Sequence, residues 1–342
     1  MALPFGPTKL AMWRLIMSKD SYDNIRIIDE LGVSNILTIE RAANAVENVF
    51  ANMYTGSARN FPTIREQLLY ADAIYGFKSG FYQGPNGGPI LGLKSGGYWP
   101  NNQQNQLANH QSTVILFNPD SGQLQALVAG NYLTALRTAA ASAVSIKYLA
   151  REDVKTLSII GAGGQAEHQL RAACKQRSFN RLLIANRNQE KAIQLGNKLS
   201  DLNLDIEIVN FQTACEQADV LITICSSWEA IVQHQWIQPG THIACMGTDT
   251  KGKQEVDINT LIHAQIFCDE LEQAISIGEC QHAFASNKLK RDEINSLGAV
   301  IVGEHPGRLD QNSITLFDST GVSLQDLACA QLVLDLKSEL TI

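Results

Sequence analysis

The sequence predicts an α/β fold built around a doubly wound parallel sheet of the Rossmann type. An apolar run at 157–160 ends in Gly161-Ala162-Gly163-Gly164-Gln165-Ala166, and this turn passes directly into a helical pattern. Several short apolar runs follow, most of them separated by segments of helix length. Alternating strands and helices of this kind are typical of a parallel, doubly wound sheet. The runs expected to form its further strands are 181–185, 206–209, 220–225, 242–246 and 265–268.

The Gly-x-Gly-x-x-Ala turn indicates a dinucleotide site. Gly161 would allow the tight turn, Gly163 would let the backbone approach a pyrophosphate, and the small Ala166 would let a helix at 165–175 pack on the strand. The N-terminus of that helix would offer unpaired N–H groups and a partial positive charge to the phosphates. Glycines after a buried strand often form only a turn, which is the alternative interpretation. The strands and helices predicted downstream of this turn favour the dinucleotide site instead.

Composition and charge exclude several classes of protein. The chain has 342 residues, which suffices for two domains, with 45% hydrophobic and 18% charged residues, as in a soluble globular protein. A formal net charge of −7 argues against nucleic acid as a partner, because proteins that bind nucleic acid have a basic surface. No apolar run reaches the ~18 residues of a membrane span. We therefore expect a small-molecule substrate and no membrane contact.

The cysteines and the N-terminus indicate a cytoplasmic protein. Seven cysteines form no Cys-x-x-Cys and no Cys/His ligand spacing, so we expect buried thiols and neither disulfides nor a metal site. The apolar stretch 10–17 is interrupted by Arg14 and lacks a small-residue cleavage site, which argues against a signal peptide. Residues 1–24 show no strong period, and an extension, a partner-contacting arm and a misassigned start all remain open.

The first part of the chain predicts an antiparallel domain. A short strand is expected at 25–28, and Thr38 begins a core helix in which Arg41 occupies the capping-box position where Glu is usual. Two runs, 113–117 and 125–128, flank a turn and predict a hairpin. The apolar residues at helical spacing are Ala42, Ala45, Val46, Val49, Phe50 and Met53.

Two cations stand out. Lys94 lies among apolar and glycine residues of a strand-like segment, so it must snorkel, pair or bind an anion. The neighbouring Gly96-Gly97 suggests close approach of a ligand or another backbone, although a solvated lysine is the alternative. Arg137 is expected in the first turn of an alanine-rich helix at 133–150, where a cation opposes the helix dipole and requires a local anion. A surface arginine is the alternative there.

The last third of the chain predicts a site at a strand end and a return to the first domain. Asp249 follows the strand 242–246, and ligands in open α/β sheets bind beyond the carboxyl ends of strands. A structural turn aspartate is the alternative. A strand at 314–317, a turn, and an amphipathic helix at 324–336 follow. This helix would return to the first domain and make it discontinuous.

Together, these motifs resemble the ornithine cyclodeaminase/μ-crystallin family, in family order from about residue 25 to the end. The resemblance implies a homodimer and a central Rossmann domain at 136–313. It also implies a discontinuous α+β substrate and dimerisation domain formed by both chain ends, at 1–135 and 314–342. The matching segments are Gly-Leu-Lys94, Leu-Thr-Ala-Leu-Arg137, Gly161-Ala-Gly163-Gly164-Gln165-Ala, Gly247-Thr-Asp249-x-x-Gly-Lys253-x-Glu255, Ile-Gly-Glu279 and Asp318-Ser319-Thr-Gly.

The resemblance implies hydride transfer between a nicotinamide and the α-carbon of an amino acid or its imine. It implies that Lys94 contacts the substrate carboxylate and exchanges a proton, that Arg137 holds carboxylate or cofactor, and that Asp249 is the acid/base at the amine nitrogen. A non-enzymatic binding protein, as among the lens and hormone-binding members, is less expected because Lys94 and Asp249 are both present. The further implied cofactor contacts are Gly161, Gly163, Gly164, Gln165, Asn186, Ser226, Met246, Gly247, Lys253 and Ser319.

Several segments most resemble family members that reduce iminosuccinate to L-aspartate. Alanine dehydrogenase, cyclic ketimine reductase and ornithine cyclodeaminase activities remain alternatives. A dicarboxylate substrate needs a partner for its second anion, and the candidates are Arg65, Lys78 and His110. The usual Pro-x-Arg of the family appears here as Pro62-Thr63-Ile64-Arg65. The resembling segments are 60–66, 75–78, 94–102, 109–112 and 276–282.

The sequence leaves the cofactor as NAD(P)H. The acidic residue that would bind the ribose diol of NAD is missing where one is expected, and the chain reads Asn186-Arg187. Arg187 is able to pair with a 2′-phosphate, whereas a solvated arginine with Asn186 on the diol is the alternative. The residues thus slightly favour NADPH, and the resemblance favours NADH.

Overall fold

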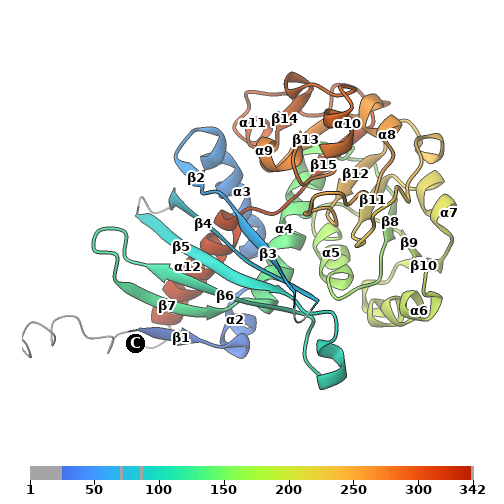
Figure 1. Ribbon diagram of the computed structural model, residues 1–342. Helices are drawn as coiled ribbons and strands as arrows, with labels where there is room; N and C mark the ends of the chain where they lie inside the picture. The colour runs from blue at the N-terminus through green and yellow to red at the C-terminus, as the bar shows by residue number, and fades with distance from the viewer. Residues whose placement is uncertain (1–24, 70–71, 85–87, 340–342) are drawn as a thin grey trace, which may run out of the picture.

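Two sheets lie side by side, and helices of the first half of the chain and the C-terminal helix pack between and behind them (Figure 1). The computed structural model describes residues 25–69, 72–84 and 88–339. The open question of residues 1–24 lies outside this described part. No helix within it combines the length and apolar character needed to cross a membrane.

The first sheet has seven strands in the order β1-β7-β6-β5-β4-β2, with β3 also paired to β4. The expected hairpin is present, because β6 and β7 run antiparallel with Thr113 opposite Ala129. The expected first strand pairs with β7 in parallel, so this sheet is mixed rather than wholly antiparallel. Parallel neighbours need a long connection, and the rest of the first domain provides it. The strands are β1 (Arg26–Ile28), β2 (Ala58–Asn60), β3 (Ile64–Leu68), β4 (Ala73–Gln83), β5 (Pro89–Tyr98), β6 (His110–Phe117) and β7 (Leu124–Ala129).

Helix α3 (Ile39–Tyr54) is the core helix expected after Thr38. The Thr38 hydroxyl accepts a hydrogen bond from the Arg41 backbone N–H at 3.2 Å, which satisfies one free donor of the first turn. The Arg41 side chain does not complete a capping box and donates instead to the Ile36 carbonyl at 2.5 Å. A short helix, α2 (Glu30–Ile36), precedes it and was not expected.

Helices α4 (Asn131–Leu149) and α12 (Ser323–Glu339) connect the two halves. The C-terminal α12 packs against β4, β5, β6 and α4, so it returns to the first sheet as expected (Figure 1). The alanines of α4 at 139–141 and 143 are buried, and their small side chains allow neighbouring helices to approach closely. Because α4 begins at Asn131, Arg137 lies in its second turn, and its placement in the first turn was wrong.

The second sheet has eight strands, all paired in parallel, in the order β10-β9-β8-β11-β12-β15-β13-β14. This confirms the doubly wound Rossmann-type sheet. The strand order reverses at β8, which lies between β9 and β11 and leads into the glycine turn, and this is where such sheets bind ligands. The strands are β8 (Thr156–Ile160), β9 (Arg181–Ala185), β10 (Asp205–Ile208), β11 (Val220–Thr223), β12 (His242–Cys245), β13 (Gln265–Cys268), β14 (Ile294–Ser296) and β15 (Thr315–Asp318).

Strand β15 corrects the boundary that we drew at residue 314. It lies between β12 and β13, parallel to both, so it belongs to the second sheet and the return to the first domain begins after Asp318. All four residues of β15 are buried. A short, continuously buried strand is typical of the centre of a parallel sheet that helices cover on both faces.

The remaining α-helices are short and lie around the second sheet, whereas the 3₁₀ turn η2 lies between β5 and β6 of the first sheet. The helix expected at 165–175 is α5 (Ala166–Ala173). All seven cysteines are free thiols, of which five are buried and two, Cys174 and Cys225, are partly exposed. No group of three or more potential metal ligands occurs among the described residues. The others are α6 (Gln189–Lys198), α7 (Phe211–Glu216), α8 (Ile258–His263), α9 (Leu271–Ala274), α10 (Gln281–Ala285) and α11 (Leu297–Ile301), with 3₁₀ turns η2 (Asn102–Asn105), η3 (Ser200–Leu202), η4 (His234–Trp236) and η5 (Arg291–Glu293).

Candidate active site

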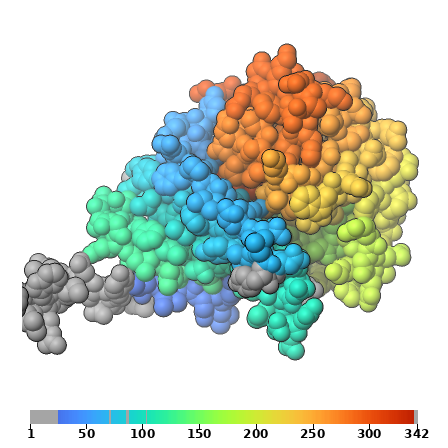
Figure 2. Space-filling view, in the orientation of Figure 1, coloured from blue at the N-terminus to red at the C-terminus, as the bar shows by residue number. Residues whose placement is uncertain are grey.

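A cavity of about 790 Å³ lies where the two sheets meet. It is lined by strands β3, β4 and β5, by α4, by the glycine turn, and by the loops that follow β11, β12 and β15. In Figure 2 the blue segment around β3 lies directly against the yellow and orange second half of the chain. The volume is within the usual range for ligand sites, so one cavity has room for a cofactor's reactive end and a small substrate.

The glycine turn leaves open space for a ligand. Gly161 has φ +121°, and a Cβ there would lie 2.8 Å from the Ile224 carbonyl oxygen, so this turn requires glycine. A Cβ at Gly163 or Gly164 would meet no protein atom within 4 Å, and both residues line the cavity. The side-chain oxygen of Gln165 is buried without a hydrogen-bond partner among the described residues. The open space at Gly163 and Gly164, just before the N-terminus of α5, therefore fits the pyrophosphate of a dinucleotide.

The loops beyond three neighbouring strands bring most of the expected cofactor residues to the same cavity. Ser226 follows β11, Met246 and Gly247 follow β12, and Ser319 follows β15. Lys253 also lines the cavity.

Asn186 and Arg187 lie at the end of β9, outside the cavity lining. The Asn186 side-chain oxygen accepts a hydrogen bond from the Ala162 backbone N–H at 3.2 Å, which ties β9 to the glycine turn. Arg187 is exposed.

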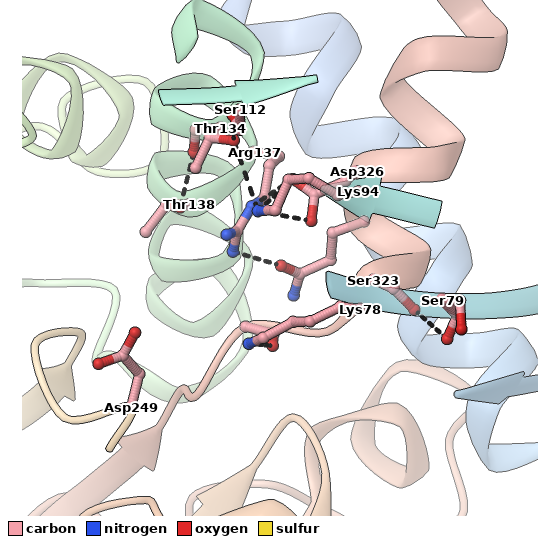
Figure 3. A network of polar contacts seen from close by, with 12 residues as sticks. Lys78, Ser79, Lys94, Ser112, Thr134, Arg137, Thr138, Asp249, Ser323 and Asp326 are labelled. Carbon is pink, nitrogen blue, oxygen red and sulfur yellow. Dashed lines mark hydrogen bonds and ion pairs between the residues drawn. The ribbon is translucent and has the colours of Figure 1, made fainter. Parts of the chain in front are cut away.

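Lys78 and Lys94 lie directly opposite each other on β4 and β5, so both side chains project from the same face of the first sheet. Each lysine is only 9% exposed. Lys94 Nζ lies 2.9 Å from Asp326 Oδ2, and Arg137 Nε lies 3.0 Å from Asp326 Oδ1 (Figure 3). Lys94 and Arg137 are therefore paired with the same anion, which their burial requires. Neither is solvated.

Burial and neighbouring cations lower the pKa of these groups. Burial is the main cause that lowers the pKa of Lys94 to about 7, and Arg137 adds to it while Asp326 opposes it. Burial, together with the charge of Arg65, lowers the pKa of Lys78 to about 8. His110 lines the same cavity, and burial with the charges of Lys94 and Arg137 lowers its pKa to about 4, so it is neutral at physiological pH.

Lys78 differs from Lys94 in its partners. Its ammonium donates to the backbone carbonyls of Thr320 at 3.1 Å and Gly321 at 2.6 Å. Among the described residues it forms no ion pair with a carboxylate within 4.0 Å. The cavity therefore contains a buried cation that contacts backbone carbonyls and no carboxylate, while Asp249 and Asp326 act on its charge from farther away.

Asp249 lies on the opposite side of the cavity, on the loop after β12 (Figure 3). Its carboxylate lies 3.2 Å from Arg65 Nη2 and 2.9 Å from Lys253 Nζ, and Arg65 also donates to Thr250 Oγ1 at 2.8 Å. Burial would raise the pKa of Asp249, but the charges of Arg65, Lys253 and Lys78 outweigh it and hold the pKa well below its usual range. Asp249 is thus a carboxylate anion, and its side chain is 35% exposed.

Sequence reasoning missed the buried carboxylate of the cation cluster, Asp326. It lies in the first turn of α12 and has no exposed side-chain surface. The available signal was its position, because a lone acid between the buried Leu324 and Leu327 is unusual unless it is paired. A second missed carboxylate, Asp269, accepts hydrogen bonds from Ser319 Oγ and the Gly321 N–H and so fixes the loop that partners Lys78.

The sequence matches the ornithine cyclodeaminase/mu-crystallin family over residues 26–339. The chain belongs to this family. Iminosuccinate reductase from Paracoccus denitrificans is 48% identical over 310 residues, which cover 91% of this chain and 96% of that protein. The resemblance inferred from the motifs is confirmed.

Solved structures of this family show the same fold. The crystal structure of the Paracoccus iminosuccinate reductase in complex with NAD⁺ has a TM-score of 0.87 at 47% identity, covering 93% of this chain and 97% of that one. An archaeal alanine dehydrogenase, solved as a dimer with bound NAD, also has a TM-score of 0.87, at 29% identity and with the same coverage. The overall fold is that of the family.

Proposed function

We propose that this chain is an NAD(P)H-dependent imine reductase that reduces iminosuccinate to L-aspartate. The observation that carries the proposal is the arrangement of charge in the cavity. Lys94 and Arg137 share one buried carboxylate, Asp326, Lys78 beside them contacts only backbone carbonyls, and Asp249 lies on the opposite side. The 48% identity to an iminosuccinate reductase supports the same assignment.

The bound nicotinamide would supply the hydride that reduces the imine carbon. Lys94 and Arg137 would hold the α-carboxylate and so fix the α-carbon in position for the transfer, which is the orienting part of catalysis. Asp249 would accept a hydrogen bond from the protonated imine nitrogen and stabilise its positive charge. Its ion pairs favour this role over proton donation. Lys94, with a pKa of about 7, is better matched to exchange a proton near neutrality.

Lys78 supports a dicarboxylate substrate. A buried charge without a counter-ion costs several kcal/mol to desolvate. The second carboxylate of iminosuccinate would supply the missing anion, whereas the methyl group of iminopyruvate would leave Lys78 unpaired. His110, neutral in the same cavity, would donate or accept a single hydrogen bond there. We therefore assign the second carboxylate chiefly to Lys78, with Arg65 occupied by Asp249.

The assembly and the cofactor are inferred from related structures and from the residues at the end of β9. We infer a homodimer, because the related archaeal alanine dehydrogenase was solved as a dimer. The NAD seen in both related structures supports NADH. The absence of an acidic residue at Asn186-Arg187 supports NADPH. The seven free cysteines suit a reducing cytoplasm.

One assay tests the proposal. The purified protein is given NADH or NADPH with oxaloacetate and ammonium, pyruvate and ammonium, or a cyclic ketimine, and ornithine is tested separately for ammonia release. We expect cofactor oxidation to be fastest with oxaloacetate and L-aspartate to accumulate stoichiometrically. Preference for pyruvate would identify an alanine dehydrogenase, and preference for the cyclic imine a ketimine reductase. Ammonia release from ornithine without net cofactor oxidation would identify a cyclodeaminase. Ligand binding without any turnover would identify a binding protein.

A further inference from the structure

Asp326 is the buried anion on which the two carboxylate-binding cations converge. Lys94 Nζ lies 3.0 Å from its Oδ1 and 2.9 Å from its Oδ2, and Arg137 Nε lies 3.0 Å from Oδ1. Arg137 Nη1 is held by the side-chain oxygen of Gln325 at 3.0 Å. Figure 3 shows the two cations reaching Asp326 from different elements, β5 and α4, while Asp326 comes from α12.

These contacts leave defined donors free for a ligand. Arg137 Nη2 has no hydrogen-bond partner among the described residues, and both cations line the cavity. The backbone of Gly321, with φ +71°, lies close to Arg137 Nη1, since a Cβ there would be 2.6 Å from that nitrogen. A ligand therefore cannot reach the guanidinium from the Gly321 side. The remaining Arg137 edge and the Lys94 ammonium therefore face the cavity.

The other charged groups around Lys94 are repulsive or neutral. Arg137 on α4 and Lys78 on β4 are cations that lower the pKa of Lys94 after burial itself. His110 on β6 is neutral at physiological pH. Burial raises the pKa of the Cys329 thiol, one turn after Asp326 on α12, to about 12, so it is also neutral. Among the described residues, Asp326 is the carboxylate that contacts Lys94 directly.

We propose that Asp326 is a positioning residue that keeps Lys94 charged and aims Lys94 and Arg137 at the substrate carboxylate. The role rests on the proposed function for the identity of that carboxylate. A guanidinium is not deprotonated in proteins, whereas a lysine ammonium is able to lose its proton. The effect of Asp326 on charge therefore falls on Lys94, because an opposite charge in contact favours the charged form of a lysine.

The test uses Asp326→Asn, which keeps the shape and removes the charge. An ion pair in contact shifts a pKa by ~1–3 units, so losing it lowers the pKa of Lys94 by about one unit or more. We expect the affinity of the NAD⁺-bound enzyme for L-aspartate, measured by calorimetry, to be close to wild type at about pH 6 and about tenfold weaker at about pH 8.5. A residue with only a structural role would weaken binding equally at every pH, and that result would overturn the proposal.

A second readout does not depend on the substrate. Acetylation of Lys94 by trace acetic anhydride, followed by mass spectrometry across pH, reports its titration midpoint, with exposed lysines as the internal reference. The midpoint is expected to fall in Asp326→Asn, and an unchanged midpoint overturns the role. If wild type does not bind L-aspartate, the proposed substrate is wrong and the midpoint alone decides the role of Asp326.

Two further variants separate charge from folding. Asp335→Asn changes an exposed aspartate on the same helix, which accepts a hydrogen bond from Gln331, and is expected to leave the Lys94 midpoint unchanged. Asp326→Glu keeps the carboxylate and is expected to hold the midpoint within about half a unit of wild type. Should Asp326→Asn fail to fold, this variant decides, because a midpoint that falls by a full unit despite the retained charge contradicts the proposal.

Discussion

The two sides of the cavity hold their charges in different ways. On the first sheet, Lys94, Arg137 and Asp326 form a buried cluster in which Asp326 has no exposed side-chain surface. On the other side, Asp249 after β12 of the second sheet pairs with Arg65 of β3 in the first sheet, and their side chains are 35% and 34% exposed. An exposed ion pair contributes about 0–1 kcal/mol, whereas breaking a buried one by removing a partner costs about 3–5 kcal/mol.

This difference separates two tasks. The buried cluster fixes its cations before any ligand arrives, which suits the binding of a carboxylate in one orientation. The Asp249 pair is only partly buried and lines the cavity, so Asp249 is able to accept a hydrogen bond from a cationic imine while Arg65 and Lys253 remain beside it. The comparison predicts that substitutions on the Asp249 side change the rate of reduction, and that substitutions among the buried cations change which substrates bind.

Asp249→Asn tests the Asp249 side with the largest expected effect. The amide keeps the shape and loses the negative charge that would stabilise the protonated imine, so reduction should fall by ~10²–10³-fold. Cofactor binding, followed by NADH fluorescence, should remain close to wild type. Single-turnover rates in a stopped-flow instrument measure the effect, and a rate within about threefold of wild type would remove Asp249 from the mechanism.

Lys78→Met tests the buried cations. We expect kcat/KM for iminosuccinate to fall by ~10²-fold while iminopyruvate is spared, because the variant loses a charged hydrogen bond and leaves the second carboxylate unpaired. Steady-state rates with oxaloacetate and with pyruvate, each in ammonium buffer, give the ratio. Lys78 is better suited to this test than Arg65, because the Lys78 ammonium has no carboxylate in contact among the described residues.

Arg65→Met is the matched comparison. Arg65 binds Asp249, so its loss should depress both substrates together rather than selectively. Equal losses in Lys78→Met as well would contradict a dicarboxylate site and favour a monocarboxylate dehydrogenase.

The pH dependence of kcat/KM gives a third test of the buried cluster. Lys94 has a pKa of about 7, so its charge is present below about pH 7 and is lost as the pH rises through that value. Because kcat/KM reports groups of the free enzyme, it should fall on the alkaline side by up to about tenfold per pH unit. The pKa of Asp249 is far below the usual range, so its titration should not change kcat/KM near neutral pH. A flat profile up to about pH 9 would mean that no charge on Lys94 is needed.

Much of the fold was predictable because it depends on local pattern. The glycine turn, the alternating apolar runs and the hairpin each specify an element from a few neighbouring residues. The strand Thr315–Asp318 was found as a strand and assigned to the wrong sheet, because its burial depends on β12 and β13, which lie far away in the sequence. The extra strand pairing of β1 with β7 is non-local for the same reason.

The site was predictable only as separate residues. Lys94, Arg137 and Asp249 each have a local reason to attract attention, namely a cation in an apolar strand, a cation in a helix and an acid after a strand. Their partners come from segments up to 232 residues away, as with Lys94 and Asp326. The pairing of Arg65 with Asp249 across the two sheets also depends on tertiary structure. No spacing rule in the sequence links such positions.

The smallest expected effect concerns the outer end of the cofactor site, away from both sides of the cavity. Arg187 is exposed at the end of β9, and Asn186 beside it is tied to the Ala162 N–H of the glycine turn. If a 2′-phosphate is bound, Arg187→Ala loses a charge-assisted contact of about 1.5–3 kcal/mol, discounted by its exposure. We therefore expect KM for NADPH to rise by about tenfold, with KM for NADH and both substrate preferences unchanged. Steady-state kinetics with each cofactor at saturating oxaloacetate and ammonium measure this. Equal or better kinetics with NADH in wild type, unaffected by the substitution, would show that Asn186 and the turn alone select the cofactor and that Arg187 is solvated.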